Sequence, residues 1–135
     1  MVKIQMEYEG DLHCKAVHGP SGRELATDAP VDNQGRGASF SPTDLVATAL
    51  GTCMLTTMGI LARALGLDIA GSTATVEKEM TTAGPRKIQR LRVKIHVPKE
   101  QDPENREKLE RAARTCPVQR SLHPEVEGPV EFVWG

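Results

Sequence analysis

The feature that most constrains this fold is one uncharged segment near the middle of the chain. Residues 45–62 contain no Asp, Glu, Lys or Arg, which is close to the length of a membrane-spanning helix. Four threonines and two glycines keep its hydropathy modest, so we interpret it as a helix buried in a core or a subunit interface. The sequence from Ser41 to Asp44 is typical of a helix start, and Gly66 is typical of a helix end. We therefore expect one helix from Pro42 to about Leu65.

A helix of about 24 residues is long for a chain of 135 residues. It is apolar on nearly every side, so more than one surface must cover it. The sheet of the same chain is expected to cover one side. A second copy of the chain is the simplest cover for another side, which predicts a homodimer.

The other segments predict an α+β fold. Residues 2–8, 12–17 and 23–28 alternate apolar and polar side chains, which favours three strands in an antiparallel meander. A polar, glycine-rich loop over residues 29–40 suits a position near a site. We then expect strands over 69–82 and 87–97, a helix over 103–115, a short helical turn after Cys116 and a strand over 130–134. Strands and helices do not alternate regularly, so we predict one α+β domain spanning residues 1–135.

Composition excludes several classes of partner. The chain has 17 basic and 18 acidic residues, a net charge of -1 and no basic cluster, so we expect no nucleic-acid partner and no membrane association. Its first residues do not resemble a signal peptide, so we expect a cytoplasmic protein. Three scattered cysteines without a C-x-x-C pair favour reactive or buried thiols over a disulfide framework or a metal site.

Two of the cysteines lie in positions that suit chemistry. Cys53 falls near the middle of the long helix, where a small core residue is the simplest interpretation. The nearby Gly51 weakens that interpretation, because a glycine inside a helix usually serves close packing or access. Cys116 directly precedes Pro117, where free amide groups of the next helical turn stabilise a thiolate. Cys14 alternates with apolar neighbours and is expected in a core.

Together these segments resemble the family of osmotically inducible protein C and the organic hydroperoxide resistance proteins. In that family a Pro-acid-Leu helix start leads to a reactive cysteine eleven residues after the proline, which is the spacing from Pro42 to Cys53. A Cys-Pro after an amphipathic helix is the second hallmark, matched by Cys116-Pro117. The resemblance covers essentially the whole chain. It implies an OsmC-like fold, an intertwined homodimer whose antiparallel strands wrap long central helices and whose active sites lie at the subunit interface.

The resemblance also implies a thiol-dependent peroxidase that reduces organic hydroperoxides. Cys53 would attack the peroxide, Cys116 would resolve the sulfenic acid as a disulfide, and an external thiol or dithiol would reset the pair without a cofactor. In the family an arginine from the N-terminal strands activates the attacking thiol, and a glutamate after the helix-start proline holds that arginine. Here Thr43 follows Pro42, so Asp44 is the candidate acid.

Other site residues are candidates without a settled role. The arginine position of the family falls near His18 or Gly19, and the candidate arginines are Arg23 and Arg36. Met54 and Met58 are expected either in the core or along an apolar substrate pocket. Two alternative functions stay open: a non-catalytic dimeric module that binds a small ligand, and persulfide handling by Cys53 alone.

Overall fold

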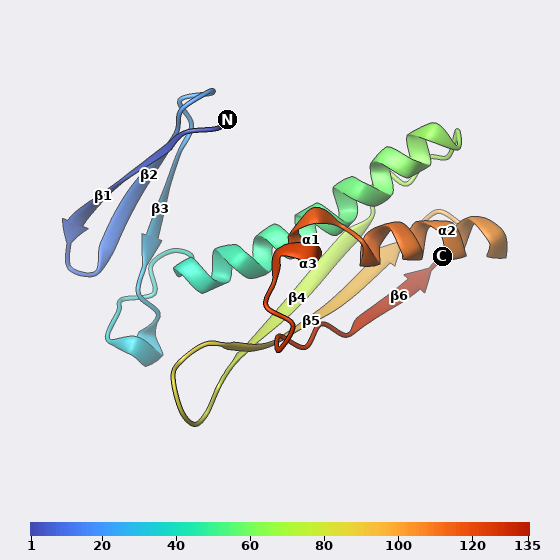
Figure 1. The fold of residues 1–135 in the computed structure, drawn as a ribbon. Helices are drawn as coiled ribbons and strands as arrows, with labels where there is room; N and C mark the ends of the chain where they lie inside the picture. The colour runs from blue at the N-terminus through green and yellow to red at the C-terminus, as the bar shows by residue number, and fades with distance from the viewer. The chain divides into compact units, whose positions relative to one another are not determined.

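The computed structural model describes residues 1–135, which divide into two compact units, residues 1–46 and 47–135. Along the chain the order is three strands, one long helix, two strands, two further helices and a last strand (Figure 1). A short 3-10 turn, η1 (Val31–Asn33), interrupts the glycine-rich loop. The order of elements confirms the α+β prediction.

The first unit contains an antiparallel meander. Its strands are β1 (Ile4–Gly10), β2 (His13–His18) and β3 (Glu24–Asp28), paired in the order β1-β2-β3. Our boundary for the second strand was wrong at Leu12. Asp11 and Leu12 have φ values of 53° and 60°, because the tight reversal between β1 and β2 requires left-handed backbone.

One face of this meander is apolar and exposed. Ile4, Met6 and Tyr8 follow one another on alternate positions of β1 and are 53%, 68% and 63% exposed. Leu25 of β3 lies opposite Ala16, which is itself paired with Met6, and is 47% exposed. Cys14, expected in a core, is half-buried opposite Tyr8. We expected β1 to be half-buried, but in the single chain its apolar side chains are exposed.

The second unit contains a mixed sheet in the order β4-β5-β6. Strands β4 (Thr73–Met80) and β5 (Ile88–Val97) are antiparallel, but β6 (Val130–Trp134) runs parallel to β5. The antiparallel strands that the resemblance implied are therefore found in β4 and β5, whereas β6 differs from that expectation. The connection from β5 to β6 passes through α2 (Pro103–Arg114) and α3 (Pro117–Ser121), and such a long crossover is what parallel pairing requires.

Strand β4 begins later than expected. Residues 69–72 form a turn in which the Ser72 N–H donates to the Ile69 carbonyl at 3.1 Å, and Gly71 has a φ of 91°. The pair Gly71-Ser72 is the local signal for this turn, and the prediction passed over it. The predicted start at residue 69 is therefore wrong by the length of the turn.

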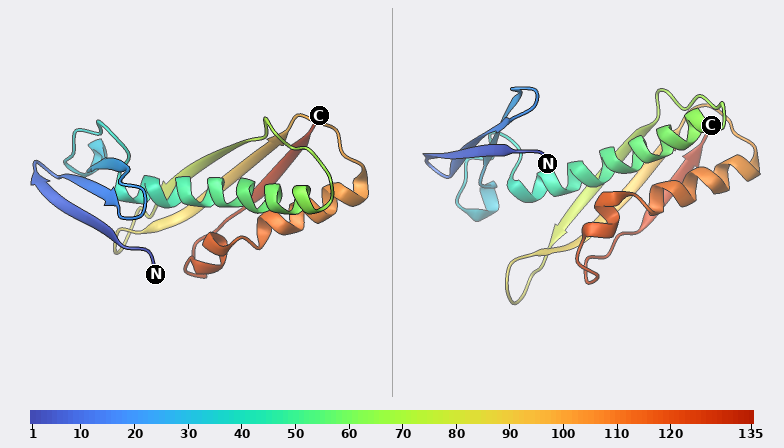
Figure 2. Two further views of the ribbon diagram at one scale, coloured as in Figure 1. Left: turned by 90° about the horizontal axis from the view of Figure 1, so that it is seen from above. Right: turned by 45° about the horizontal axis from the view of Figure 1, so that its top comes forward.

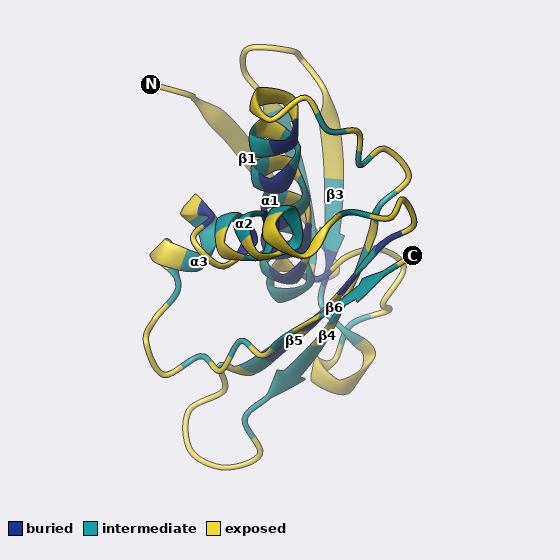
Figure 3. Ribbon diagram, turned by 90° about the vertical axis from the view of Figure 1, so that its right-hand side faces the viewer, coloured by how far each residue is buried: buried dark blue, intermediate teal, exposed yellow.

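The core lies between this sheet and the two longer helices. Figure 2 shows residues 47–64 of α1 (Pro42–Ala64) and the whole of α2 on the same face of the sheet. The inward side chains of β5 alternate with exposed basic residues, as the sequence predicted. Figure 3 shows buried residues where the helices face the strands. The largest fully buried apolar side chains are Leu50, Met54, Met58, Leu91, Val93, Ile95, Val97 and Leu109.

Helix α1 (Pro42–Ala64) has the predicted length and ends. At its C-terminus the Leu67 N–H donates to the Ala62 carbonyl at 2.8 Å, and Gly66 has a φ of 69°, which is the geometry of a glycine helix end. By length and composition the helix is apolar enough to cross a membrane, as a core helix of a soluble protein also is. Its buried residues share one stripe, whereas Ile60 is 68% exposed.

Candidate functional site

Cys116 lies at the junction of α2 and α3. Its backbone is extended, with a φ of -65° and a ψ of 152°, and Pro117 occupies the first helical position of α3. The Gln119 N–H donates to the Cys116 Sγ at 3.4 Å, so a thiol fills the N-cap role that a hydroxyl or carboxylate usually has. The side chain is fully buried. This placement confirms the short helical turn predicted after Cys116.

The fold brings Cys116 against Cys53 of α1. Cys53 lies close enough to Cys116 to raise the pKa of its thiol, and both are free thiols. Cys53 is half-buried, whereas Cys116 has no exposed surface. Two thiols that are far apart in the sequence thus form a pair in which one member is open to solvent and the other is enclosed.

The environment of Cys116 raises the pKa of its thiol. Burial is the largest cause, since a thiolate loses hydration in an apolar surrounding, and the neighbouring Cys53 raises the pKa further. The backbone amides of Gln119 and Val118 lower it, but less. The helix amides therefore act in the expected direction, but burial outweighs them and the pKa of Cys116 is raised. Cys116 keeps its proton at neutral pH.

Gly51 sets the distance between α1 and the sheet. A Cβ at this position would lie 3.0 Å from the Cγ2 of Val76 and 3.7 Å from the Cβ of Ala74, both on β4. The first distance is shorter than ordinary van der Waals contact. The interpretation of Gly51 as a close-packing glycine is confirmed, and it lies two positions before Cys53.

The two candidate methionines are both fully buried. Met54 also borders a cavity of about 330 Å³, together with Arg114, Gln119 and residues 128–130. The Gln119 Oε1 is buried and has no hydrogen-bond partner. Sequence reasoning did not select Gln119 or Arg114. The only available signal was their position on either side of Cys116-Pro117.

The remaining candidates lie in the first unit. The Asp44 carboxylate accepts from the Ser41 N–H at 2.9 Å, and the Ser41 Oγ accepts from the Asp44 N–H at 3.1 Å, which is a capping box. Arg23 and Arg36 are exposed. The charge of Arg36 contributes to the low pKa of Asp28.

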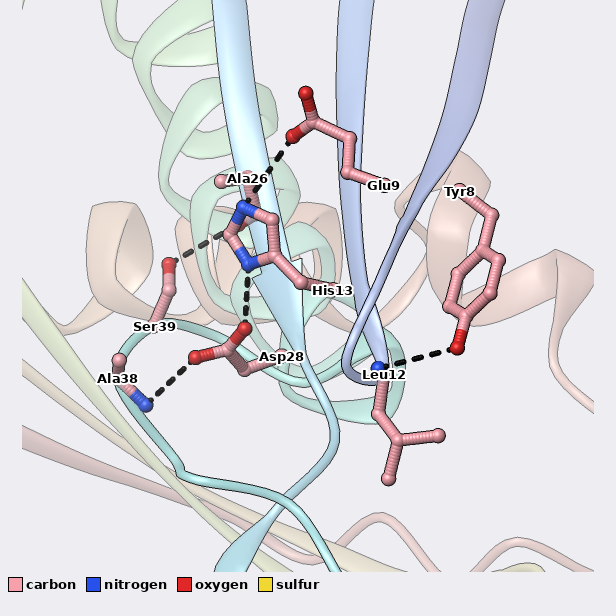
Figure 4. Close-up of polar contacts among 8 residues, drawn as sticks. All are labelled: Tyr8, Glu9, Leu12, His13, Ala26, Asp28, Ala38 and Ser39. Carbon is pink, nitrogen blue, oxygen red and sulfur yellow. Dashed lines mark hydrogen bonds and ion pairs between the residues drawn. The ribbon is translucent and has the colours of Figure 1, made fainter.

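Asp28 is the centre of a polar cluster that the sequence did not reveal (Figure 4). It is 2% exposed, and its Oδ1 lies 2.5 Å from the Nδ1 of His13, whose Nε2 lies 3.5 Å from Glu9. The Ala38 N–H donates to the other Asp28 oxygen at 2.9 Å. The hydrogen bond with His13 is the main cause that lowers the pKa of Asp28. The cluster fastens the glycine-rich loop to β2 and β3. No group of three or more side chains in the chain forms a metal site.

Comparison with known proteins agrees with this arrangement. The family model described as OsmC-like protein matches residues 35–130. This chain belongs to the OsmC-like protein family. A search of curated proteins found no match. The match covers α1, both cysteines of the pair and most of the mixed sheet, so the resemblance drawn from the sequence is confirmed.

Solved structures of OsmC-like proteins share the fold. A protein from Psychrobacter arcticus, named for osmotic stress induction and a detoxification response, is 45% identical, with a TM-score of 0.93 over 98% of this chain and 96% of that one. An organic hydroperoxide resistance protein OsmC from Legionella pneumophila has a TM-score of 0.78 at 13% identity, over 98% and 96% of the two chains. An OsmC-like protein from Mycoplasma pneumoniae has a TM-score of 0.83 at 15% identity, over 99% and 96%.

Proposed function

We propose that this protein is a thiol-dependent peroxidase that reduces organic hydroperoxides with Cys53 and Cys116. The observation that carries the proposal is the closeness of two free thiols, one half-buried and one enclosed. Family membership supports it, as do structural relatives that are named organic hydroperoxide resistance proteins.

The unequal environments of the two thiols suit unequal roles. The Cys53 thiolate attacks the hydroperoxide, the O–O bond breaks, and the alkoxide leaves and takes up a proton to become the alcohol. Cys53 is then a sulfenic acid. The Cys116 sulfur attacks it, the S–S bond forms, and hydroxide leaves with the Cys116 proton as water. The closeness of Cys116 to Cys53 supports its role as the attacking sulfur, and the proton that it holds supports the release of hydroxide as water. Two equivalents of an external thiol, or one dithiol, then restore the pair.

The assembly we propose is a cytoplasmic homodimer. The exposed face around Ile4, Met6 and Tyr8, and the uncovered side of α1 around Ile60, are large apolar surfaces, and such surfaces mark sites of association. A second copy of the chain would cover them. In such a dimer Arg23 or Arg36, held by Asp44, would supply the positive charge that favours the Cys53 thiolate.

The proposal is tested by following the loss of cumene hydroperoxide or tert-butyl hydroperoxide with reduced protein and dithiothreitol. Cys53→Ser should abolish turnover, whereas Cys14→Ser is the matched control and should keep it. Peptide mapping after stoichiometric peroxide should find a Cys53–Cys116 disulfide. A folded wild-type protein that consumes no peroxide would contradict the proposal. Full peroxide turnover in Cys116→Ser would show that Cys53 and the external thiol complete the cycle, and it would contradict the resolving role of Cys116.

A further inference from the structure

The carbonyl of Thr115 has lost its usual helical donor. Pro117 disfavours a helical Cys116, whose ψ is 152°, so Thr115 is the C-terminal cap of α2. In a continuous helix the N–H of Gln119 would donate to the Thr115 carbonyl. That N–H donates instead to the Cys116 Sγ at 3.4 Å. The corner that presents the enclosed thiol therefore has a carbonyl that another group must satisfy.

The side chain of Arg120 supplies the missing donor. Its Nε–H donates to the Thr115 carbonyl at 3.1 Å. The backbone N–H of the same residue donates to the Cys116 carbonyl, also at 3.1 Å. One residue thus bonds the peptide groups on both sides of the Cys116 Cα. Because these two peptide groups define φ and ψ of Cys116, they also define the direction of its Cα–Cβ bond.

The surroundings of Arg120 leave its side chain to this task. Residues 111–124 contain no Asp or Glu, so no acidic neighbour in the sequence competes with the Thr115 carbonyl. The Arg120 side chain is exposed, so replacing it should leave the core of the second unit intact. An effect on the cysteine pair can therefore be separated from an effect on the fold.

We propose that Arg120 is a positioning residue that holds Cys116 ready to form a disulfide with Cys53. It touches no reacting atom and acts through the backbone on both sides of Cys116. A thiol held in place has a higher effective concentration toward its partner, because less freedom is lost when the bond forms. The effect of Arg120 on the sulfenic acid step rests on the proposed peroxidase function, whereas its effect on the equilibrium between dithiol and disulfide does not.

The equilibrium is tested in glutathione buffers with the wild type, Arg120→Met and Arg111→Met. One glutathione thiolate breaks the protein S–S bond, which gives a mixed disulfide and a protein thiolate that takes up a proton. A second glutathione thiolate attacks the glutathione sulfur, which releases the other protein thiol and glutathione disulfide. In Arg120→Met the ratio of protein disulfide to dithiol should fall by about threefold, the size expected for one exposed hydrogen bond.

Arg111→Met is the matched control. It removes the same charge from an exposed arginine of α2, which is paired with Glu107 at 2.9 Å, and it should leave the ratio unchanged. The fall in Arg120→Met should persist at high salt, which screens charge effects. An unchanged ratio in Arg120→Met, an equal fall in Arg111→Met, or a fall that high salt abolishes overturns the proposal. Both variants should keep the urea midpoint of the wild type, as surface substitutions do.

The peroxide steps are followed separately in single turnovers with cumene hydroperoxide. The Cys53 sulfenic acid, trapped with dimedone, should form in Arg120→Met at the wild-type rate but convert to the disulfide about threefold more slowly. A general loss of structure would slow both steps. Equal rates of conversion in Arg120→Met and the wild type overturn the positioning role. A wild type that forms no sulfenic acid, with the glutathione result intact, would refute the peroxidase and leave the positioning role standing.

Discussion

Gly51→Ala is expected to separate the packing of α1 from its intrinsic helix stability. The added Cβ would lie 3.0 Å from the Val76 Cγ2, so the helix or the strand must move by a few tenths of an ångström. Gly59→Ala is the matched control in the same helix. A Cβ there meets no atom of the chain within 4 Å, so within one chain the control changes helix propensity alone.

The expected magnitudes have opposite signs. Replacing a helical glycine with alanine stabilises by about 1 kcal/mol. Overpacking at a tight contact destabilises by about 1–3 kcal/mol. Gly51→Ala should therefore lower the free energy of unfolding by about 1 kcal/mol, whereas Gly59→Ala should raise it by a similar amount. Val76→Ala removes the obstructing methyl groups, so the double variant with Gly51→Ala should be more stable than the sum of the two single changes predicts, by about 1–2 kcal/mol.

The assay is urea unfolding at one fixed protein concentration, because association of chains would make stability depend on concentration. Trp134 is the single tryptophan of the chain, and it is half-buried with its indole N–H donating to Glu110 at 3.1 Å, so its fluorescence reports on the second unit. A Gly51→Ala variant that gains as much stability as Gly59→Ala would refute the close-packing role. If the changes in unfolding free energy of Gly51→Ala and Val76→Ala simply added in the double variant, the tight contact of the new Cβ would not be with Val76.

Three further outcomes are expected. The pKa of Asp28 is lowered below its usual value of 3.8, so the stability that this carboxylate contributes is present above that value and is lost as the pH falls through the lower value in the folded protein. The protection of the Ala38 amide from hydrogen exchange, relative to an unfolded amide at the same pH, should fall in that acidic range, and Asp28→Asn should lower it at neutral pH. Unchanged protection would show that other contacts hold the loop. Alkylation with iodoacetamide at neutral pH should label Cys53 well before Cys116, because Cys116 is enclosed and holds its proton; mass spectrometry that found the reverse order would contradict the assigned roles. Met6→Lys places a charge on the exposed face of β1 and should convert the proposed dimer to monomer in light scattering, whereas the same charge at Gln5 on the opposite face should not.

The elements themselves could be predicted because their signals are local. The capping box of Ser41 and Asp44, the glycine after α1 and the alternation along β5 each depend on residues a few positions apart. The hydrogen bonds of a cap or a helix form within one element. The apolar face of a helix or strand can be buried against any apolar surface, so its pattern does not depend on which partner covers it. The positions of Cys53 and Cys116 within their elements were available in the same way.

The chemistry of the site depended on contacts between distant segments, which no local pattern contains. The parallel pairing of β6 with β5 follows from how the crossover through α2 and α3 packs on the sheet. That packing encloses Cys116 against Cys53, and burial then raises a pKa that the helix amides alone would have lowered. The same packing leaves the Gln119 oxygen unpaired, and the folding of the loop onto the meander buries Asp28 beside His13. The hydration and hydrogen bonding of a polar group depend on all of its neighbours in space. The environments of Cys116, Gln119 and Asp28 could therefore be determined only from the tertiary structure.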